Sequence, residues 1–399
     1  MMSGVSKYCV LALGVLLGSG PSDTPAFRPP QPYQLEQVYT QIKQQCSTND
    51  LACFLTGLHS ITAQHGPRAA LEVFALLQDR GDIPATVDGH HIAHHIGHQT
   101  AMVFGSSAQA LALCPTSYNY GCMHGFFQHA LGSGEITDQA AAKICDDWTQ
   151  DRFLSLKTKQ SCYHGVGHGV MIRADYDLPK ALSACDQLGS PFAQQGCWQG
   201  AFMENMDAAE QGQWHKAQFS LQDPLAPCDR VDAKYQYQCF LNQSAWLMKF
   251  YHNDVSQAAQ ACLKGPQSAI TPCLEAIGIL TTNSEWQPLL LQGAESKTFL
   301  ENAWTICKRF PHGYEDYCMV AALDNLMNSN TVNLAQAKQF CRLVGKHLRA
   351  ECRARIDVNL WYLIPPAKKK HPRHAATEVG QRASTGGGPA QIEDVRSTE

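Results

Sequence analysis

The chain has no basic excess, because its 399 residues carry 31 lysines and arginines against 35 aspartates and glutamates. A surface that binds a nucleic-acid backbone needs a clear excess of positive charge. Long apolar runs are also missing, since no segment after residue 26 reaches eighteen uncharged apolar residues, about the length that spans a bilayer as a helix. We therefore expect no nucleic-acid partner and no membrane span.

Several catalytic motifs are absent as well. The sequence holds no P-loop, dinucleotide fingerprint, GxSxG elbow or CxxCH haem site, which disfavours nucleotide, flavin, serine-hydrolase and c-type haem chemistry. It also holds no CxxC knuckle and no HExxH box, the usual patterns of zinc-thiolate sites and zincins.

The two ends of the chain differ from its middle. Residues 1–26 have the pattern of a secretory signal, in which Lys7 precedes a short apolar run and the small residues of GSGPSDTPA follow. We expect this segment to be removed on export to the periplasm or the medium, with an uncleaved anchor as the alternative. Residues 364–399 are polar, rich in glycine, proline and serine, and expected to be disordered.

Cysteine is abundant, and Cys9 within the expected signal leaves sixteen of the seventeen cysteines in the mature chain. An even number in regular local couples predicts disulfides in an exported protein. The couples are Cys46/Cys53, Cys114/Cys122, Cys145/Cys162, Cys185/Cys197, Cys228/Cys239, Cys262/Cys273, Cys307/Cys318 and Cys341/Cys352.

The cysteines also mark an internal repeat. The second cysteine of each couple begins an apolar, helix-like run such as CYHGVGHGVM, and the first closes another such as DLPKALSAC. Each unit is therefore predicted as helix A, a turn and helix B. The long gap between Cys53 and Cys122 predicts one further unit, whose helix B begins at Asp88 without a cysteine. We expect an all-α superhelix, a solenoid of about nine α-hairpins over residues 33–363, stapled by disulfides within the hairpins.

Histidines recur in register within this repeat, beginning with five between Val87 and Gly105. When each helix-B start is counted as zero, histidines occupy positions two, six and seven of successive units. Positions two and six lie one turn apart on the same helix face. The predicted metal ligands are His90, His94, His95, His124, His129, His164 and His168, and the polar residues that continue the pattern are Gln128, Gln199 and Glu204.

Two interpretations of the histidine pattern remain open. Stacked, partly buried imidazoles repel one another once protonated and leave ring nitrogens without partners. A transition-metal ion resolves both problems, and copper, zinc and iron all accept neutral imidazole. Five or more nitrogens exceed the needs of one tetrahedral ion, so either two ions bind or some histidines only support the ligands. The alternative is a scaffold whose histidines face solvent or make ordinary hydrogen bonds.

Glycines lie beside the histidines, at Gly125, Gly165, Gly167, Gly169 and Gly200. Each costs a helix interior about 1 kcal/mol relative to alanine. Either close approach of neighbouring helices or access of a ligand to a metal explains them.

The cysteine-closed hairpins, with DLPKALSAC and DVSQAAQAC, resemble the cysteine-rich secreted type of Sel1-like repeat proteins and the wider tetratricopeptide-like class. The resemblance implies a right-handed α/α superhelix with a concave surface for a small-molecule or peptide ligand. It implies nothing about the histidines.

Three functions follow as hypotheses. The first is an exported metal-dependent enzyme that activates water or dioxygen, with Gln128, Gln199 or Glu204 acting beside the ion. The second is a metal-handling protein without catalysis, and the third is a disulfide-stiffened interaction scaffold. An enzyme leaves a coordination position open beside a pocket, whereas a structural site is closed.

Overall fold

The computed structural model describes residues 29–149, 155–210, 219–220, 222–291, 295–328 and 334–363. These residues form sixteen α-helices and one short 3₁₀ helix, and they contain no β-strand. The fold is therefore all-α, as predicted. The expected signal, residues 1–26, and the expected tail, residues 364–399, lie outside the described residues.

Nine helices form a series in which each contacts the next one along the chain. They correspond to the predicted B helices. They are α2 (Leu51–Asp79), α3 (Gly89–Phe104), α5 (Gly121–Gly132), α7 (Leu156–Arg173), α9 (Pro191–Glu210), α10 (Ala233–Phe250), α12 (Gln267–Leu291), α14 (Glu315–Asn328) and α16 (Arg349–Leu363).

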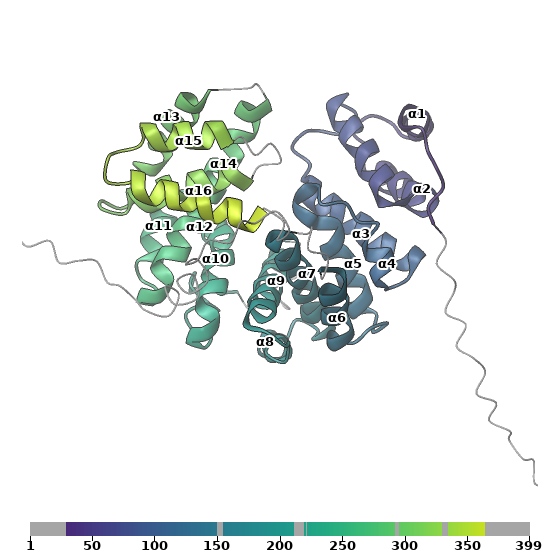
Figure 1. Ribbon diagram of the computed structural model, residues 1–399, viewed down its shortest axis with the longest axis horizontal. Coiled ribbons are helices and arrows are strands. Elements are labelled where there is room, and N and C mark those ends of the chain that lie inside the picture. The colour runs from purple at the N-terminus through teal and green to yellow at the C-terminus, as the bar shows by residue number, and fades with distance from the viewer. Residues whose placement is uncertain are drawn as a thin grey trace, which may run out of the picture.

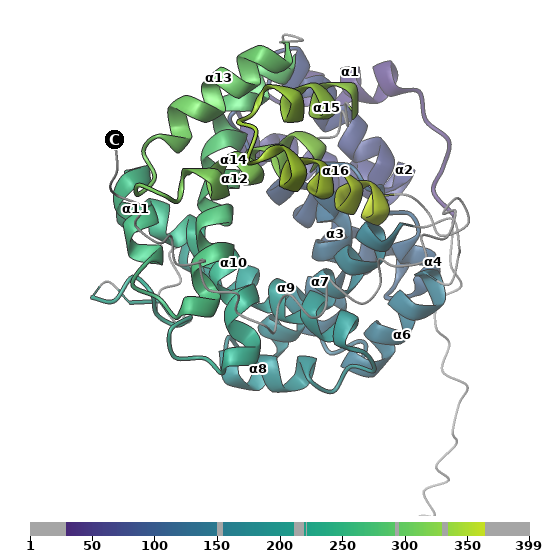
Figure 2. The same ribbon diagram turned by 60° about the vertical axis from the view of Figure 1, so that its left-hand side comes forward.

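The remaining helices precede members of this series along the chain. They are α1 (Leu35–Gln45), α4 (Ala108–Leu111), η1 (Tyr118–Tyr120), α6 (Asp138–Thr149), α8 (Leu178–Cys185), α11 (Val255–Cys262), α13 (Ser296–Cys307) and α15 (Leu334–Leu343). Figure 1 shows α2 to α9 on one side of the molecule and α10 to α16 on the other. In Figure 2 the series curves around, with α6, α8 and α11 on its outer side. Helix α16 also contacts α7, so the chain curves back toward its middle.

All eight predicted cysteine couples are disulfide-bonded, with Cα–Cα separations of 5.4 to 5.7 Å. Cys185, Cys262 and Cys307 are each the last residue of a helix, as the repeat predicted. Their partners lie in the next helix of the series. The two cysteines of these three bridges are 11 or 12 residues apart in the sequence. A bridge that closes a loop of this length stabilises the fold by roughly 3 kcal/mol in the chain-entropy model.

The helices of the series begin earlier than the cysteine pattern predicted. Helix α7 begins at Leu156, ahead of Cys162, and the hydroxyl of Ser155 caps it by accepting from the Thr158 amide. Helix α9 likewise begins at Pro191, ahead of Cys197. The cap residues determine where a helix starts. The cysteine only has to face the preceding helix, and it can do so from the second turn.

The unit without a cysteine begins where the sequence predicted. Asp88 is the N-cap of α3, and its carboxylate accepts from the His90 amide. Its preceding helix is the second half of α2, which changes direction at Gly66 with φ 83° and ψ 170°. Glycine adopts this conformation readily, and Pro67 is well placed to begin the next helical segment. Because the backbone at Gly66 is not helical, α2 consists of two helical segments, and the second takes the place of the predicted helix A.

Candidate metal centre

Helices α3, α5, α7 and α9 approach one another so closely that their backbones touch. A Cβ atom on Gly125 of α5 would lie 1.8 Å from the His94 carbonyl oxygen of α3. One on Gly200 of α9 would lie 1.9 Å from the His164 carbonyl oxygen of α7. Gly167 and Gly169 make equivalent backbone contacts. The structure therefore favours close helix approach as the explanation of these glycines, and this approach brings side chains from three helices together.

Five imidazoles converge between these helices, and we call them the five-histidine cluster. Neighbouring rings in the cluster have centroids 4.6 to 5.3 Å apart. Four of the side chains are buried and the fifth, His90, is partly buried. The cluster consists of His90 and His94 from α3, His124 from α5, and His164 and His168 from α7.

The first pair of the cluster presents two lone pairs to each other. Nδ1 of His90 donates to the Tyr118 carbonyl oxygen at 2.8 Å. Nδ1 of His94 donates to Oε1 of Gln128 at 3.2 Å, and the Gln128 amide is oriented by its donation to Glu204. Because each Nδ1 carries the ring proton, each Nε2 of a neutral ring carries a lone pair. These two Nε2 atoms lie 3.1 Å apart.

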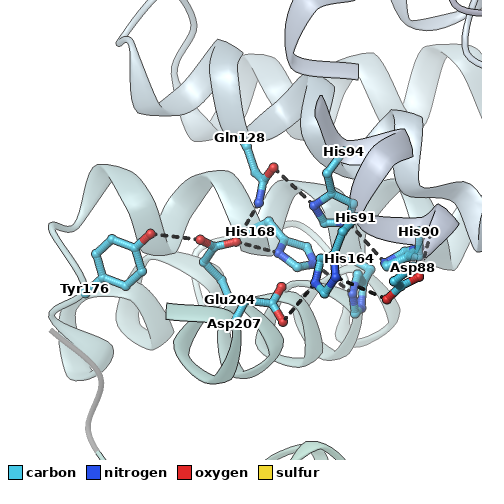
Figure 3. A network of polar contacts seen from close by, with 10 residues as sticks. All are labelled: Asp88, His90, His91, His94, Gln128, His164, His168, Tyr176, Glu204 and Asp207. Atoms are coloured by element: carbon cyan, nitrogen blue, oxygen red, sulfur yellow. Dashed lines mark hydrogen bonds and ion pairs between the residues drawn. The ribbon is translucent and has the colours of Figure 1, made fainter. Parts of the chain in front are cut away.

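The second pair lies two helices further along the series, on α7, with the same spacing of its Nε2 atoms. Nδ1 of His168 donates to Oε2 of Glu204 at 2.8 Å, as Figure 3 shows. The side chain of Gln199 hydrogen-bonds to His164. The Nε2 atoms of His164 and His168 are again 3.1 Å apart. Both pairs thus turn their Nε2 atoms inward.

His124 lies between the two pairs. Its ring centroid is 5.3 Å from those of His90 and His94, 4.7 Å from that of His164 and 5.2 Å from that of His168. Within the described part of the chain, neither ring nitrogen of His124 has a hydrogen-bond partner. A buried polar atom left in this state costs about 1 to 3 kcal/mol.

Burial keeps four rings of the cluster uncharged. It lowers the pKa of His90 below the usual value of histidine, and it lowers the pKa of His94, His124 and His164 much further. Repulsion from the neighbouring imidazoles adds to this effect. Neutral imidazole is the form that binds a metal ion, so these four rings can bind one without first losing a proton.

Three groups of side chains in the described residues could each hold a metal ion, with ligand atoms within 4.8 Å of one another. Two of them are made entirely of histidine and satisfy the convergence that the sequence predicted. The groups are His90, His94 and His124; His124, His164 and His168; and His168, Glu204 and Asp207.

Two predicted ligands, His95 and His129, do not join the cluster. His95 is exposed, with its ring centroid 6.3 Å from that of His59. Nδ1 of His129 lies 3.3 Å from Nε2 of His98, and its Nε2 lies 3.1 Å from Glu135. Position seven is rotated by about 100° from position six on a helix, and this rotation turns both rings away from the cluster.

The polar residues predicted to act beside the ion contact the histidines from outside. Gln128 accepts from His94 and donates to Oε2 of Glu204 at 2.7 Å. Oε1 of Glu204 accepts from the Tyr176 hydroxyl at 2.9 Å. Gln199 contacts His164, and its Oε1 accepts from Gln160. Partners of this kind fix the orientation of ligand rings and raise their basicity.

A cavity of about 870 Å³ adjoins the cluster. Its volume is within the range of small-molecule sites. His94 belongs both to the cluster and to the cavity wall, so a ligand in the cavity can reach the histidines. The wall is formed by His91, His94, His95, His98, Gln128, His129, Gly132, Ser133, Ile172, Tyr176, Glu204 and Asp207.

The wall includes residues that the sequence pattern did not predict as functional, among them His91, Tyr176 and Asp207. The ring of His91 lies 3.1 Å from Asp88 and 3.9 Å from Asp207, as Figure 3 shows. These two carboxylates raise the pKa of His91 to about 10, so it is a cation at neutral pH. Asp207 follows Glu204 by three residues, a spacing that shares a helix face and could have revealed it.

The other half of the series carries a different polar cluster, formed by Glu275 of α12, Asp324 of α14 and Arg355 of α16. Arg355 pairs with Glu275 and lies 3.3 Å from Asp324. Asn359 donates to Asp324 at 2.8 Å. Burial, together with the neighbouring Asp324 carboxylate, raises the pKa of Glu275 to about 7, despite the opposing charge of Arg355.

Replacing Glu275 by glutamine is expected to change how stability depends on pH. Folding raises the pKa of Glu275, so between about pH 4.5 and 7 the folded state holds a proton that the unfolded state has lost. This contribution is complete below pH 4.5 and is lost as the pH rises through 7. Wild-type stability relative to Glu275→Gln should fall by about 2 to 3 kcal/mol across this window, measured by urea unfolding. The exposed Glu301→Gln is the control; a difference that does not vary with pH would mean that Glu275 is ionised throughout.

Three further observations concern the disulfides, the length and polarity of the helices, and the similarity of this chain to known proteins. Eight disulfides are typical of proteins in an oxidising compartment. In the described ranges, no helix has both the length and the apolar character needed to cross a membrane. Comparison with protein-family models, with curated proteins and with solved structures finds no match to this chain.

Proposed function

We propose that this chain is an exported metalloprotein, a solenoid of about nine α-hairpins whose five-histidine cluster binds a transition-metal ion and whose cavity binds a small molecule or peptide. Two features support the solenoid: the order of contacts along the helix series and the disulfides that join successive helices. The resemblance to Sel1-like repeats remains part of this proposal. The bound ion would make the protein a metal-dependent enzyme.

The single observation that carries the proposal is the arrangement of unshared lone pairs around His124. Each histidine pair holds two Nε2 atoms 3.1 Å apart, and in the first pair both atoms carry lone pairs that repel each other. A cation placed between them turns this repulsion into two bonds. Ligand nitrogens at bond lengths of about 2.0 to 2.1 Å in tetrahedral geometry are separated by a little over 3 Å, which matches the pairs.

The donor set narrows the identity of the ion. Imidazole nitrogen suits copper, zinc and iron, whereas calcium and magnesium prefer oxygen. The proton on each outer Nδ1 of His90, His94 and His168 is held by an acceptor. This is the usual environment of ligand histidines.

Three nitrogens leave a coordination position open on a four-coordinate ion, which is typical of catalytic sites. The adjoining cavity provides the place for a substrate. The ion would supply activation of water or of dioxygen. Both oxygens of Glu204 already accept hydrogen bonds, so Glu204 positions His168. Asp207, on the cavity wall, is the better candidate to accept a proton.

One observation favours metal handling without catalysis as a second candidate. His98, His129 and Glu135 form a chain of contacts at the exposed side of the cavity. These groups could deliver an ion from solvent to the cluster. A scaffold without metal is the third candidate, and the following two experiments separate the three.

The chain purified after export is expected to contain at least one copper, zinc or iron ion per molecule by elemental analysis. His94→Ala removes one ligand of the cluster. Loss of a supporting partner alone costs about 10- to 100-fold in metal affinity, so loss of this ligand should cost at least about 100-fold. His312→Ala, at a fully exposed position, should retain the metal. Wild-type protein that neither contains nor takes up metal would leave the scaffold as the only candidate.

Asp207→Asn is expected to keep the metal but lose about 100-fold in kcat, because loss of a positioned proton acceptor costs that much or more. The assay is turnover of hydrolysable or oxidisable small molecules and peptides by the metal-loaded protein. The exposed and remote Glu301→Gln is the control. Metal-loaded protein without turnover would favour metal handling, and an unchanged kcat would exclude this role for Asp207.

A further inference from the structure

We infer that the five-histidine cluster is a dinuclear centre in which His124 bridges two metal ions as an imidazolate. His90 and His94 would hold one ion, and His164 and His168 would hold the other. This inference rests on the proposed function, since it requires that the cluster bind metal. It adds the number of ions and their connection.

The cluster contains two ligand pairs of the same geometry. In each pair the two histidines are four residues apart on the same helix, α3 for one pair and α7 for the other. In each pair the two Nε2 atoms are 3.1 Å apart. Each pair forms a group of three with the same residue, His124, with all ligand atoms of a group within 4.8 Å. The protein therefore contains the same two-histidine site twice, and the two sites share one ring.

The His124 ring has two buried nitrogens that both need a partner. A neutral imidazole has one N–H and one lone pair, and both nitrogens of this ring are buried without a partner among the described residues. A single ion would bind one nitrogen and leave the buried N–H without an acceptor. Two ions satisfy both nitrogens. Neighbouring His94 and His168 cannot accept from it without giving up the lone pairs that they direct at their own partners.

The bridge also has a balanced chemistry. When the second ion binds, the remaining N–H bond of His124 breaks, its electron pair forms the new metal bond, and the proton leaves to solvent. The resulting imidazolate carries one negative charge. Glu204 and Asp207, both buried beside His168, add two more. Two divalent ions in a buried site need such compensation, because unbalanced buried charge is costly.

The bridge fixes the distance between the ions at about 6 Å, the sum of two bonds of about 2 Å and the width of the ring. This exceeds the 3.5 to 4 Å typical of two-metal hydrolytic sites. Each ion then has three nitrogen ligands and keeps an open position. His94, which lines the cavity, brings the first ion next to a bound substrate.

The test uses the full chain after export, loaded with Cu²⁺ and freed of excess ion. Two unpaired electrons on Cu²⁺ ions joined by an imidazolate couple with each other. We expect two copper ions per chain by elemental analysis, a half-field transition in the electron paramagnetic resonance spectrum, and a spin count well below two per chain at low temperature.

Two double variants dissect the centre. His90→Ala/His94→Ala and His164→Ala/His168→Ala should each bind one copper ion that shows one full, uncoupled spin. His347→Ala changes an exposed histidine remote from the cluster and should keep two coupled ions. Far-ultraviolet circular dichroism and the absence of free thiols establish that each variant has folded with its disulfides intact.

The outcomes separate this inference from the proposed function. Wild-type protein that binds one copper ion, or two ions with two full spins, would overturn the bridge while the metal centre stands. Wild-type protein that binds no copper, zinc or iron would overturn the proposed function itself. Two coupled ions that become one uncoupled ion in each double variant would establish the bridge.

Discussion

Gly125→Ala is expected to lower the free energy of unfolding by about 2 kcal/mol and to abolish metal binding at the five-histidine cluster. The added Cβ would lie 1.8 Å from the His94 carbonyl oxygen, which is a backbone atom and cannot rotate away. Helices α3 and α5 would have to separate by about 1.5 Å to reach ordinary contact. Overpacking of this kind costs typically 1 to 3 kcal/mol and sometimes more, which exceeds the gain of about 1 kcal/mol in helix propensity.

The metal should be lost together with the stability, because the displaced residue is itself a predicted ligand. A shift of α3 by this amount separates His90 and His94 from His124, and ligand geometry tolerates only a few tenths of an ångström. Gly189→Ala is the matched control, since a Cβ there meets nothing within 4 Å. Urea unfolding and elemental analysis report the two effects. Unchanged stability in Gly125→Ala would mean that the helices are not in backbone contact.

Much of the fold was predictable because the cysteines repeat with the hairpins. A disulfide needs its Cα atoms within about 7 Å, so regular local couples such as Cys185 and Cys197 fix where one helix ends and the next lies. The unit without cysteine was found from the spacing of the others, and its start at Asp88 is confirmed. The contact of α16 with α7 depends on packing that the repeat does not encode.

The centre of the site was predictable for a related reason. Residues at positions two and six of stacked helices share a face, and all five histidines at these positions from the second to the fourth units converge. Residues outside this face were harder to place. Asp207 and Tyr176 reach the site from a later turn of α9 and from the segment after α7. His95 and His129 share a position with Glu204 but face a different neighbour.

The cluster is costly for the protein without metal. Among the residues that the structure describes, neither ring nitrogen of His124 has a partner, and each such atom costs about 1 to 3 kcal/mol when buried. The ring is buried where α3, α5 and α7 meet, and at Gly125 and Gly165 these helices lie close against one another. A site that costs stability when empty is typical of function, since stability and function often conflict.

Replacing His124 by leucine should therefore have opposite effects in the absence and presence of metal. In a chelator, His124→Leu is expected to be about 1 to 3 kcal/mol more stable than the wild type, because apolar replacement of unpartnered polar atoms removes their desolvation cost. With metal at about 1,000 times the dissociation constant, binding stabilises the wild type by about 4 kcal/mol. The variant lacks the shared ligand and gains little.

Thermal and urea unfolding in chelator and in excess Zn²⁺ measure this reversal directly. The exposed His347→Leu is the control, and its stability should follow the wild type in both conditions. A His124→Leu protein that is less stable than the wild type in chelator would show that the ring makes favourable contacts of its own. One that matches the wild type in its response to Zn²⁺ would show that His124 is not a ligand. Only a metal-binding role for this buried ring predicts that His124→Leu is more stable than the wild type in chelator and less stable than the wild type in excess Zn²⁺.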